Sequence, residues 1–330
     1  MSGVQMKTVA PDEDGMRLDR WFKAHFPSVR HGELEKFLRK GQVRVAGGRV
    51  KSNRRLETGE DVRIPPLSDE ASPPRPPRQT KASPEDAAEL RKMVVFEDDD
   101  IIALNKPFGL AVQGGTKTSR HLDAMLEAFA TGGERPRLVH RLDKDTGGLM
   151  LVAKTRLAAQ KLGQAFKGHA VEKIYWALTA GVPYPREGTI DMPIAKRMVR
   201  REDGEQERVV AAEGEGAKKA VSDYQVLEEA GPVAFVAMRP ITGRTHQLRV
   251  HATAIDCPVV GDGKYGGAAA HIEGVSNKLH LFCRSMTFPH PKTGRKMTLA
   301  APLTGHMAET WKFFSFDARA TCQWPEDLHR

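Results

Sequence analysis

A proline-rich stretch over residues 65–84 (PPLSDEASPPRPPRQTKASP) divides this chain of 330 residues. Its seven prolines, mixed with Ser, Arg and Lys, cannot form a packed core and favour an extended, semi-rigid linker. A chain of this length suits about two domains. We therefore predict a small domain over residues 1–64, a linker over 65–90 and a larger domain over 91–330.

The chain is strongly basic, with a formal net charge of +9. Such a surface favours a polyanionic partner such as nucleic acid. No apolar run reaches the roughly 18 residues of a membrane span, and the N-terminus is polar and acidic, so we expect a cytoplasmic protein without a membrane partner. Cys257, Cys283 and Cys322 are too far apart for a zinc site and fit no disulfide framework.

The first domain combines helical and strand patterns. Apolar residues recur at helical spacing over 17–26 and 33–41, and short strand-like runs follow over 43–45, 49–56 and 61–65. These runs predict a small α/β domain of two helices and three strands.

The same domain carries many cations. Between Arg30 and Arg55, nine Lys and Arg residues stand against two acidic residues. A charge run alone is most often a solvated face. On a compact helix-and-strand unit it favours contact with phosphates, and we expect Arg39, Lys40 and Arg44 to make such contacts.

The larger domain has helices separated by several consecutive strands, which predicts an α+β fold with a mixed, largely antiparallel sheet and flanking helices. We expect helices over 121–129, 155–168 and 245–255. The expected strands are 94–97, 101–107, 149–155, 173–181, 220–229, 233–240 and 279–288. Asp98, Asp99 and Asp100 would suit a metal, but a hairpin turn is the better interpretation.

A polar loop is enclosed by two apolar strands in LVHRLDKDTGGLMLVAKT, residues 138–155. A lone Asp in a loop is usually a turn former. Here Asp143 lies at the rim of a core, where burial raises the pKa of a carboxyl group and a nearby cation lowers it. A nucleophilic Asp must stay ionised, so it needs a cationic partner.

A second cluster, RPITGRTHQLRVHA over residues 239–252, begins at a strand end and enters a helix. A helix start with several cations binds a phosphate or carboxylate well, although a basic surface helix has the same pattern. The chain has no GxGxxG or GxxxxGK[ST] loop, no HExxH and no GxSxG. We therefore expect neither a cofactor nor a metal.

Together, HRLDKDTGGL (140–149) and GRTHQLRVH (243–251) resemble the RluA-type pseudouridine synthases. The segments 104–115, 172–178, 258–267 and 288–295 resemble the other motifs of that family, in the same order. The resemblance covers roughly residues 93–303. The pattern of the first domain resembles the small S-four-type RNA-binding domain.

The resemblance implies roles for particular residues. Asp143 would be the catalytic nucleophile, Arg244 its cationic partner, and Tyr175 the residue that stacks on the target base and takes part in the late removal of a proton. Arg141 would wedge into the RNA stack as the uridine leaves it. The remaining residues of the motifs would shape the pocket or contact RNA: His140, Lys173, His246, Gln247 and Arg249.

Two positions depart from the family pattern. Gly147 stands where the family usually has Ser, and Phe282 stands where Leu-His-Ala is common, giving Leu281-Phe282-Cys283. Neither position is the nucleophile, and both are expected to alter the pocket or the fit of the RNA.

The resemblance is nearest to the RluC-type branch, which modifies 23S ribosomal RNA of the large subunit, so we expect ribosomal RNA or pre-ribosomal particles as partners and a monomer as the working form. A tRNA, another site in ribosomal RNA, or a non-catalytic role in ribosome assembly are alternatives. A hydrolase using Asp143 and Asp145 is a further one, although no array of sugar-binding aromatic residues accompanies them. Attack on the sugar, attack on the base and a glycal route all remain open.

Overall fold

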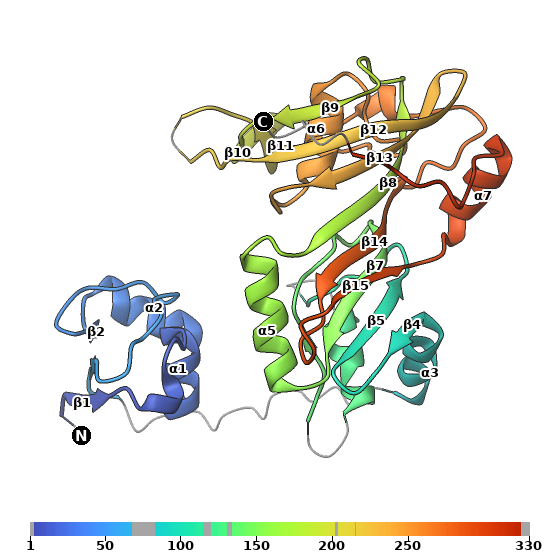
Figure 1. Cartoon of the computed structure of the whole chain (residues 1–330). Coiled ribbons are helices and arrows are strands. Elements are labelled where there is room, and N and C mark those ends of the chain that lie inside the picture. The colour runs from blue at the N-terminus through green and yellow to red at the C-terminus, as the bar shows by residue number, and fades with distance from the viewer. Residues whose placement is uncertain are drawn as a thin grey trace. The chain divides into compact units, whose positions relative to one another are not determined.

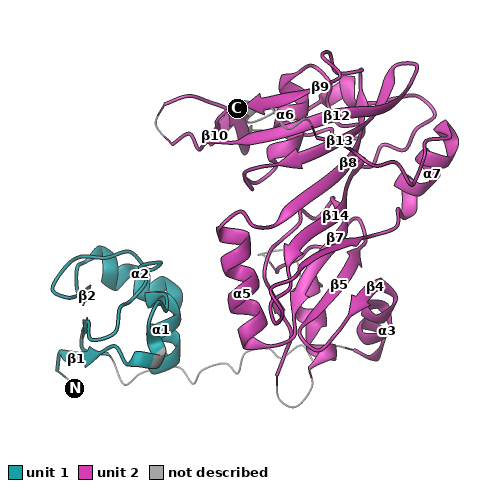
Figure 2. Ribbon diagram, in the orientation of Figure 1, with its two compact units in different colours: residues 1–80 teal, residues 81–330 magenta. Residues whose placement is uncertain are grey.

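The computed structural model describes residues 3–67, 83–114, 120–130, 134–201, 204–214 and 216–324, without the side chains of residue 12 and residues 200–207. The chain divides into two compact units, residues 1–80 and 81–330 (Figure 2). Within the described residues, no helix is both long and apolar enough to cross a membrane.

Unit 1 is a three-stranded antiparallel sheet, in the order β1-β3-β2, packed against two helices. Its elements are β1 (Gln5–Thr8), η1 (Pro11–Glu13), α1 (Leu18–His25), α2 (His31–Arg39), β2 (Arg44–Val45) and β3 (Asp61–Ile64). Leu18, Trp21 and Phe22 of α1 and Leu34 of α2 are almost fully buried in its core. Both predicted helices are confirmed.

The strand predicted over residues 49–56 is wrong. In its place, the carbonyl oxygens of Ser52 and Arg54 accept hydrogen bonds from the main-chain N–H groups of Asp19 and Leu18, at 2.9 and 2.8 Å. The segment therefore satisfies the free donors at the start of α1, which a helix cannot satisfy itself. The third strand of the sheet is β1, which the sequence analysis did not predict.

The predicted linker, residues 65–90, is wrong in its last part, and its residues 68–82 lie outside the described residues. Helix α3 (Pro84–Met93) begins within it. The Ser83 hydroxyl accepts a hydrogen bond from the N–H of Asp86 at 3.1 Å, and the Asp86 carboxylate accepts one from the N–H of Ser83 at 3.3 Å. This reciprocal cap, with proline in the first turn, starts a helix at the end of a proline-rich stretch.

Unit 2 is built around a ten-stranded sheet in the order β4-β5-β7-β14-β8-β13-β12-β9, with β6 beside β7 and β15 beside β14. Its strands are β4 (Val94–Glu97), β5 (Ile101–Lys106), β6 (Arg137–Leu138), β7 (Gly147–Ala153), β8 (Glu172–Ala180), β9 (Glu187–Asp191), β12 (Val221–Ala230), β13 (Val233–Pro240), β14 (Leu281–Pro289) and β15 (Lys296–Ala300). A separate hairpin is formed by β10 (Ile194–Arg201) and β11 (Gly204–Ala211).

The described helices of unit 2, besides α3, are α4 (Leu122–Met125), η2 (Leu126–Phe129), α5 (Arg156–Lys167), α6 (Gln247–Ala254), η3 (Gly267–Ala270) and α7 (Gly305–Phe314). Only β7 and β14 pair in parallel among the described strands of the main sheet, so the predicted α+β class with a largely antiparallel sheet is confirmed. Helix α7 and the β10–β11 hairpin were not predicted.

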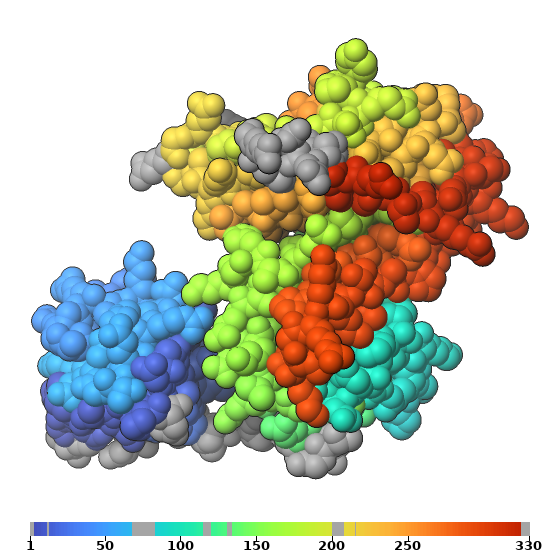
Figure 3. Space-filling model, in the orientation of Figure 1, coloured from blue at the N-terminus to red at the C-terminus, as the bar shows by residue number. Residues whose placement is uncertain are grey.

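Strand β8 connects the two halves of the sheet (Figure 1). It pairs with β14 over residues 172–177 and with β13 over residues 175–180. Helix α5 packs against β7 and β14. The surface of α5 adjoins that of the β14–β15 hairpin (Figure 3). The site described below lies where β8 passes from one half of the sheet to the other.

The acidic turn at Asp98 joins β4 to β5, as predicted for a hairpin. One carboxylate oxygen of Asp98 accepts hydrogen bonds from the N–H groups of Asp100 and Ile101, each at 2.8 Å. Its other oxygen lies 2.9 Å from Nε2 of His290, which the sequence analysis did not connect with this turn.

Candidate active site

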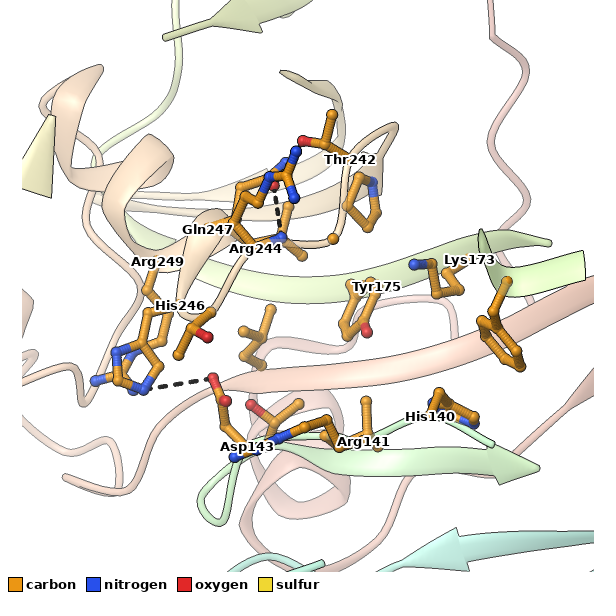
Figure 4. Close-up of a pocket in the computed structure, with 18 residues that line it drawn as sticks. His140, Arg141, Asp143, Lys173, Tyr175, Thr242, Arg244, His246, Gln247 and Arg249 are labelled. Atoms are coloured by element: carbon orange, nitrogen blue, oxygen red, sulfur yellow. Dashed lines mark hydrogen bonds and ion pairs between the residues drawn. The ribbon is translucent and has the colours of Figure 1, made fainter. Parts of the chain in front are cut away.

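A pocket of about 330 Å³ lies between the 140–146 loop and the segment that leads into α6 (Figure 4). Strand β8 contributes Lys173 and Tyr175 to it. The other predicted site residues that line it are His140, Arg141, Asp143, Arg244, His246, Gln247 and Arg249. The structure thus brings together two motifs that are about a hundred residues apart.

A buried lysine fixes the backbone of the Asp143 loop. Lys106, at the end of β5, is fully buried, and its Nζ donates to the carbonyl oxygens of Pro107, Leu110 and Lys144 at 2.9, 2.9 and 3.1 Å. Burial lowers the pKa of Lys106 to about 8, against the opposing effect of the nearby carboxylates. We did not single out Lys106 from the sequence, although a lysine that ends an apolar strand was a signal.

The two departures from the family pattern are packed together. Gly147 and Phe282 are partners in the parallel pairing of β7 with β14. A Cβ on Gly147 would lie 2.8 Å from the Phe108 ring, and the Phe108 and Phe282 rings are 6.0 Å apart. The Phe108 ring therefore occupies the space that a serine side chain would need, which explains the glycine.

Gln247 organises the opposite wall of the pocket. Its Oε1 accepts from the Thr242 hydroxyl at 2.7 Å and from the N–H of Arg244 at 3.0 Å. Its Nε2 donates to the carbonyl oxygen of Val221 at 2.9 Å and to the Ser222 hydroxyl at 2.8 Å. All donors and acceptors of this buried amide are used inside the protein, so its contacts favour the first of its two expected roles, shaping the pocket, over contact with RNA.

The predicted ion pair between Arg244 and Asp143, both of which the structure describes, is not present. Arg244 is exposed, and its Nε donates to the carbonyl oxygen of Lys219 at 3.1 Å. The buried cation of the site is Arg249, which pairs with both oxygens of Asp262 at 2.6 and 2.7 Å. Burial disfavours its charge, but Asp262 and then Asp143 raise the pKa of Arg249.

Asp143 faces His246 across the pocket, and the dashed line in Figure 4 joins them. Nε2 of His246 lies 3.7 Å from Oδ2 of Asp143. The side chain of His246 is 20% exposed and that of Asp143 is 25% exposed. Burial lowers the pKa of His246, which keeps the ring neutral at neutral pH. His246 was predicted to contact RNA, and in the structure it adjoins the proposed nucleophile.

Burial shifts the pKa values of three further pocket residues, Tyr175, Lys173 and His140. Burial raises the pKa of Tyr175 well above its ordinary value, so its phenol is neutral. Burial also lowers the pKa of Lys173, and it lowers that of His140 to about 3. His140 accepts a hydrogen bond from the N–H of Leu151 at 2.8 Å and stacks on Phe166, so it shapes the pocket as a neutral ring.

Other predicted residues lie at the edge or elsewhere. Arg141 is exposed beside Asp143. Asp145 lines a different hollow from Asp143, which does not suit a hydrolase with two carboxylates in one pocket. Arg39, Lys40 and Arg44 are exposed residues of unit 1.

Comparison with known proteins gives a consistent set of relatives. The family model described as RNA pseudouridylate synthase matches residues 100–254. The ribosomal large subunit pseudouridine synthase C of Yersinia pestis is 35% identical over 307 residues, covering 92% of this chain and 93% of that protein. The protein of the same name from Escherichia coli (strain K12) is 33% identical over 310 residues, covering 91% and 93%.

A solved structure shares the fold. Human RNA Pseudouridylate Synthase Domain Containing 4 is similar at a TM-score of 0.57 and 30% sequence identity. The similarity covers 69% of this chain and 95% of that chain.

Proposed function

This chain belongs to the RNA pseudouridylate synthase family, which confirms the resemblance of its motifs, and we propose that it converts uridines of large-subunit ribosomal RNA to pseudouridine with Asp143 as the nucleophile. The observation that carries this proposal is the pocket itself. A half-buried carboxylate lies at its rim, and the neutral ring of Tyr175 forms part of its wall.

The reaction moves the glycosidic bond of uridine from N1 to C5 of the base. The bond between N1 and the sugar breaks, a bond between C5 and the sugar forms, the proton on C5 is lost and N1 gains a proton. No electron is transferred and no group is added. The protein therefore has to supply a carboxylate, an enclosed pocket and a route for one proton.

The target base must first leave the RNA stack, which costs roughly a few kcal/mol. Tyr175 offers the detached base a ring to stack on, and such stacking contributes about 1–3 kcal/mol. Arg141 is exposed beside Asp143, where it can occupy the space that the uridine vacates. Leu142 and Leu281 provide apolar wall, which excludes water from the reacting carbon.

Arg249 takes the role that the sequence analysis gave to Arg244. It is 7% exposed, and its charge is electrostatically coupled to Asp143. A permanent cation near a carboxylate favours the ionised form that a nucleophile needs. Arg244, exposed at the mouth of the pocket, is available for the phosphates of the incoming RNA.

The substrate assignment rests on two features. The relatives that match over most of this chain are named as large-subunit ribosomal pseudouridine synthases. Unit 1 has its own core and presents exposed cations from α2 and β2, which suits the backbone of a structured RNA. We propose that unit 1 is an RNA-binding domain and that the protein acts in the cytoplasm, where ribosomes are assembled.

The nucleophile is tested by Asp143→Asn, with Asp145→Asn as the matched control. Tritium release from 5-tritiated uridine in 23S ribosomal RNA should be lost in Asp143→Asn, whereas RNA affinity is retained. Asp145→Asn, two residues away in another hollow, should keep most of its turnover. Turnover by Asp143→Asn at more than about a thousandth of the wild-type rate would remove Asp143 from the nucleophile's role.

The role of unit 1 is tested on the full chain by Arg39→Gln with Lys40→Gln. If both residues contact phosphates, the slope of log Kd against log salt should fall by roughly 0.7–0.9 for each of them. Lys92→Gln with Lys312→Gln removes two exposed lysines of unit 2 as a control. If the slope of log Kd against log salt is the same in the two double variants, Arg39 and Lys40 are solvated surface residues that do not contact phosphates.

A further inference from the structure

His246 has an unusual backbone conformation beside the proposed nucleophile. It immediately precedes α6 with φ of 56° and ψ of 15°, in the left-handed region that a residue with a Cβ seldom adopts. Such strain persists where the surrounding structure requires it and is often found at functional sites. The conformation places the two ring nitrogens of His246 against two partners, Asp143 and Tyr265.

Tyr265 lies on the far side of the His246 ring from Asp143. Its hydroxyl is 2.6 Å from Nδ1 of His246, whereas Nε2 faces Asp143. Tyr265 belongs to the 258–267 motif, and no role for it was predicted from the sequence.

The position of Tyr265 is fixed by the buried ion pair of the site. Its main-chain N–H donates to Oδ1 of Asp262 at 3.1 Å, and the guanidinium carbon of Arg249 lies 4.9 Å from the centre of its ring. The same Asp262 binds Arg249 through both oxygens. The phenol is therefore held by its backbone, by its ring face and by its hydroxyl at once.

The surroundings of His246 set the direction of the Tyr265 hydroxyl. On the other side of the ring, Nε2 faces the carboxylate of Asp143 at 3.7 Å, and an ionised carboxylate can only accept a hydrogen bond. The proton of the Tyr265 hydroxyl is then donated to Nδ1 of His246 at 2.6 Å. Since a neutral imidazole carries one proton, that proton must be on Nε2, which faces Asp143.

We propose that Tyr265 is a positioning residue of the reaction, which acts through His246. By donating to Nδ1, it selects the tautomer of His246 whose Nε2–H points at Oδ2 of Asp143. The inference rests on the proposed function of Asp143. It gives His246 the task of stabilising the ionised carboxylate and orienting one of its oxygens, so that the other is presented to the uridine.

The alternative tautomer would be unfavourable. With the proton on Nδ1, the lone pair of Nε2 would face a carboxylate oxygen 3.7 Å away. The charged groups around His246 are Asp143 and Asp262, which favour its protonation, and Arg249 and Lys264, which oppose it. Together with burial they keep the ring neutral, so that its proton is assigned by Tyr265 rather than shared with solvent.

Tyr265→Phe tests the proposal, with Tyr224→Phe as the matched control. Tyr224 is buried, and its hydroxyl donates to the carbonyl oxygen of Pro185 at 3.0 Å, away from the pocket. In Tyr265→Phe we expect kcat to fall roughly tenfold at neutral pH with little change in KM. The acid limb of kcat/KM should move to higher pH, because the nucleophile loses a donor that favours its ionised form.

A double variant separates positioning from mere packing. In His246→Gln, the side-chain amide can donate to Asp143 without help from Tyr265. Adding Tyr265→Phe to His246→Gln should therefore have little further effect on kcat, whereas the two effects would multiply if they were independent. Multiplying effects, or an unmoved acid limb in Tyr265→Phe, would overturn the proposal.

Side-chain ¹⁵N NMR of the full protein gives a readout that does not depend on activity. The His246 signal, assigned by its loss in His246→Gln, should show a protonated Nε2 in the wild type and in Tyr224→Phe, and a mixture of tautomers in Tyr265→Phe. An unchanged tautomer in Tyr265→Phe would overturn the proposal. If the wild type forms no pseudouridine in ribosomal RNA, the proposed function fails, but the tautomer still decides whether Tyr265 controls His246.

Discussion

The two walls of the pocket differ in how they use their polar residues. In the 140–146 loop the backbone is fixed from outside by Lys106, and the side chains of Arg141 and Asp143 are left to face the pocket. In the wall formed by residues 242–249, the α6 wall, Arg244 and His246 reach the pocket, but the side chains of Gln247 and Arg249 are paired inside the protein. A motif rich in polar residues can therefore serve mainly to hold the structure of the pocket. Whether one of its side chains can contact a ligand depends on its burial and on its pairing inside the protein.

The largest effect is expected from removing the buried cation of the α6 wall. Arg249→Met would leave the carboxylate of Asp262 buried without its partner, which should reduce the free energy of unfolding by about 3–5 kcal/mol. Urea unfolding of the full chain, followed by a probe in unit 2, measures this loss. If the free energy of unfolding falls by less than about 1 kcal/mol, the ion pair between Arg249 and Asp262 does not hold this wall in place.

The next effect concerns the loop side, where two departures from the family are packed together. Gly147→Ser would place a Cβ only 2.8 Å from the Phe108 ring and should destabilise unit 2 by about 1–3 kcal/mol. Phe108→Leu should offset part of that loss when added to Gly147→Ser. Independent, additive effects of the two substitutions in urea unfolding would contradict the proposed packing.

A smaller effect follows from His140, whose folded-state pKa of about 3 is below its unfolded value near 6.5. The unfolded chain takes up a proton as the pH falls through 6.5, and the folded chain does not. The neutral ring of His140 therefore makes its full contribution to the free energy of unfolding above pH 6.5. This contribution is lost progressively towards pH 3, and the loss is about 1–2 kcal/mol at pH 5.

His140→Gln keeps an acceptor for the N–H of Leu151 and should flatten this dependence between pH 7.5 and 5. His271→Asn, at an exposed position, is the control and should leave the dependence as it is in the wild type. An unchanged slope of stability against pH in His140→Gln would show that the folded protein accommodates a charged ring at this position.

The comparison of the two walls also shows what the sequence could predict. Helices α5 and α6, the predicted site residues that line the pocket, and seven strands of unit 2 followed from periodicity and from motif order, because both are local properties of the chain. Those strands are β4, β5, β7, β8, β12, β13 and β14. The cation that we propose to favour the ionised form of Asp143 did not follow. Arg244 and Arg249 are equivalent cations in the sequence, and only the burial of Arg249 beside Asp262 distinguishes them.

The same limit applies to Tyr265 and Lys106. Each acts through contacts with carbonyl or imidazole groups that are remote in sequence, such as Lys144 for Lys106 and His246 for Tyr265. Neither contact has a periodic or compositional signature. The segment over residues 49–56 was misinterpreted for a similar reason, since its carbonyl groups bind the start of a helix instead of a neighbouring strand.

The smallest effect on stability is expected at Arg244, the exposed cation of the α6 wall. Arg244→Gln loses one hydrogen bond, to the carbonyl oxygen of Lys219, at the surface, and the free energy of unfolding should change by less than about 0.5 kcal/mol. If Arg244 contacts phosphate, KM for RNA should rise several-fold and the salt slope of binding should fall by roughly 0.7–0.9, with little change in kcat. A large fall in kcat with unchanged KM would instead indicate that Arg244 is the cationic partner of Asp143. Both walls of the pocket would then contribute a charged side chain to the chemical step.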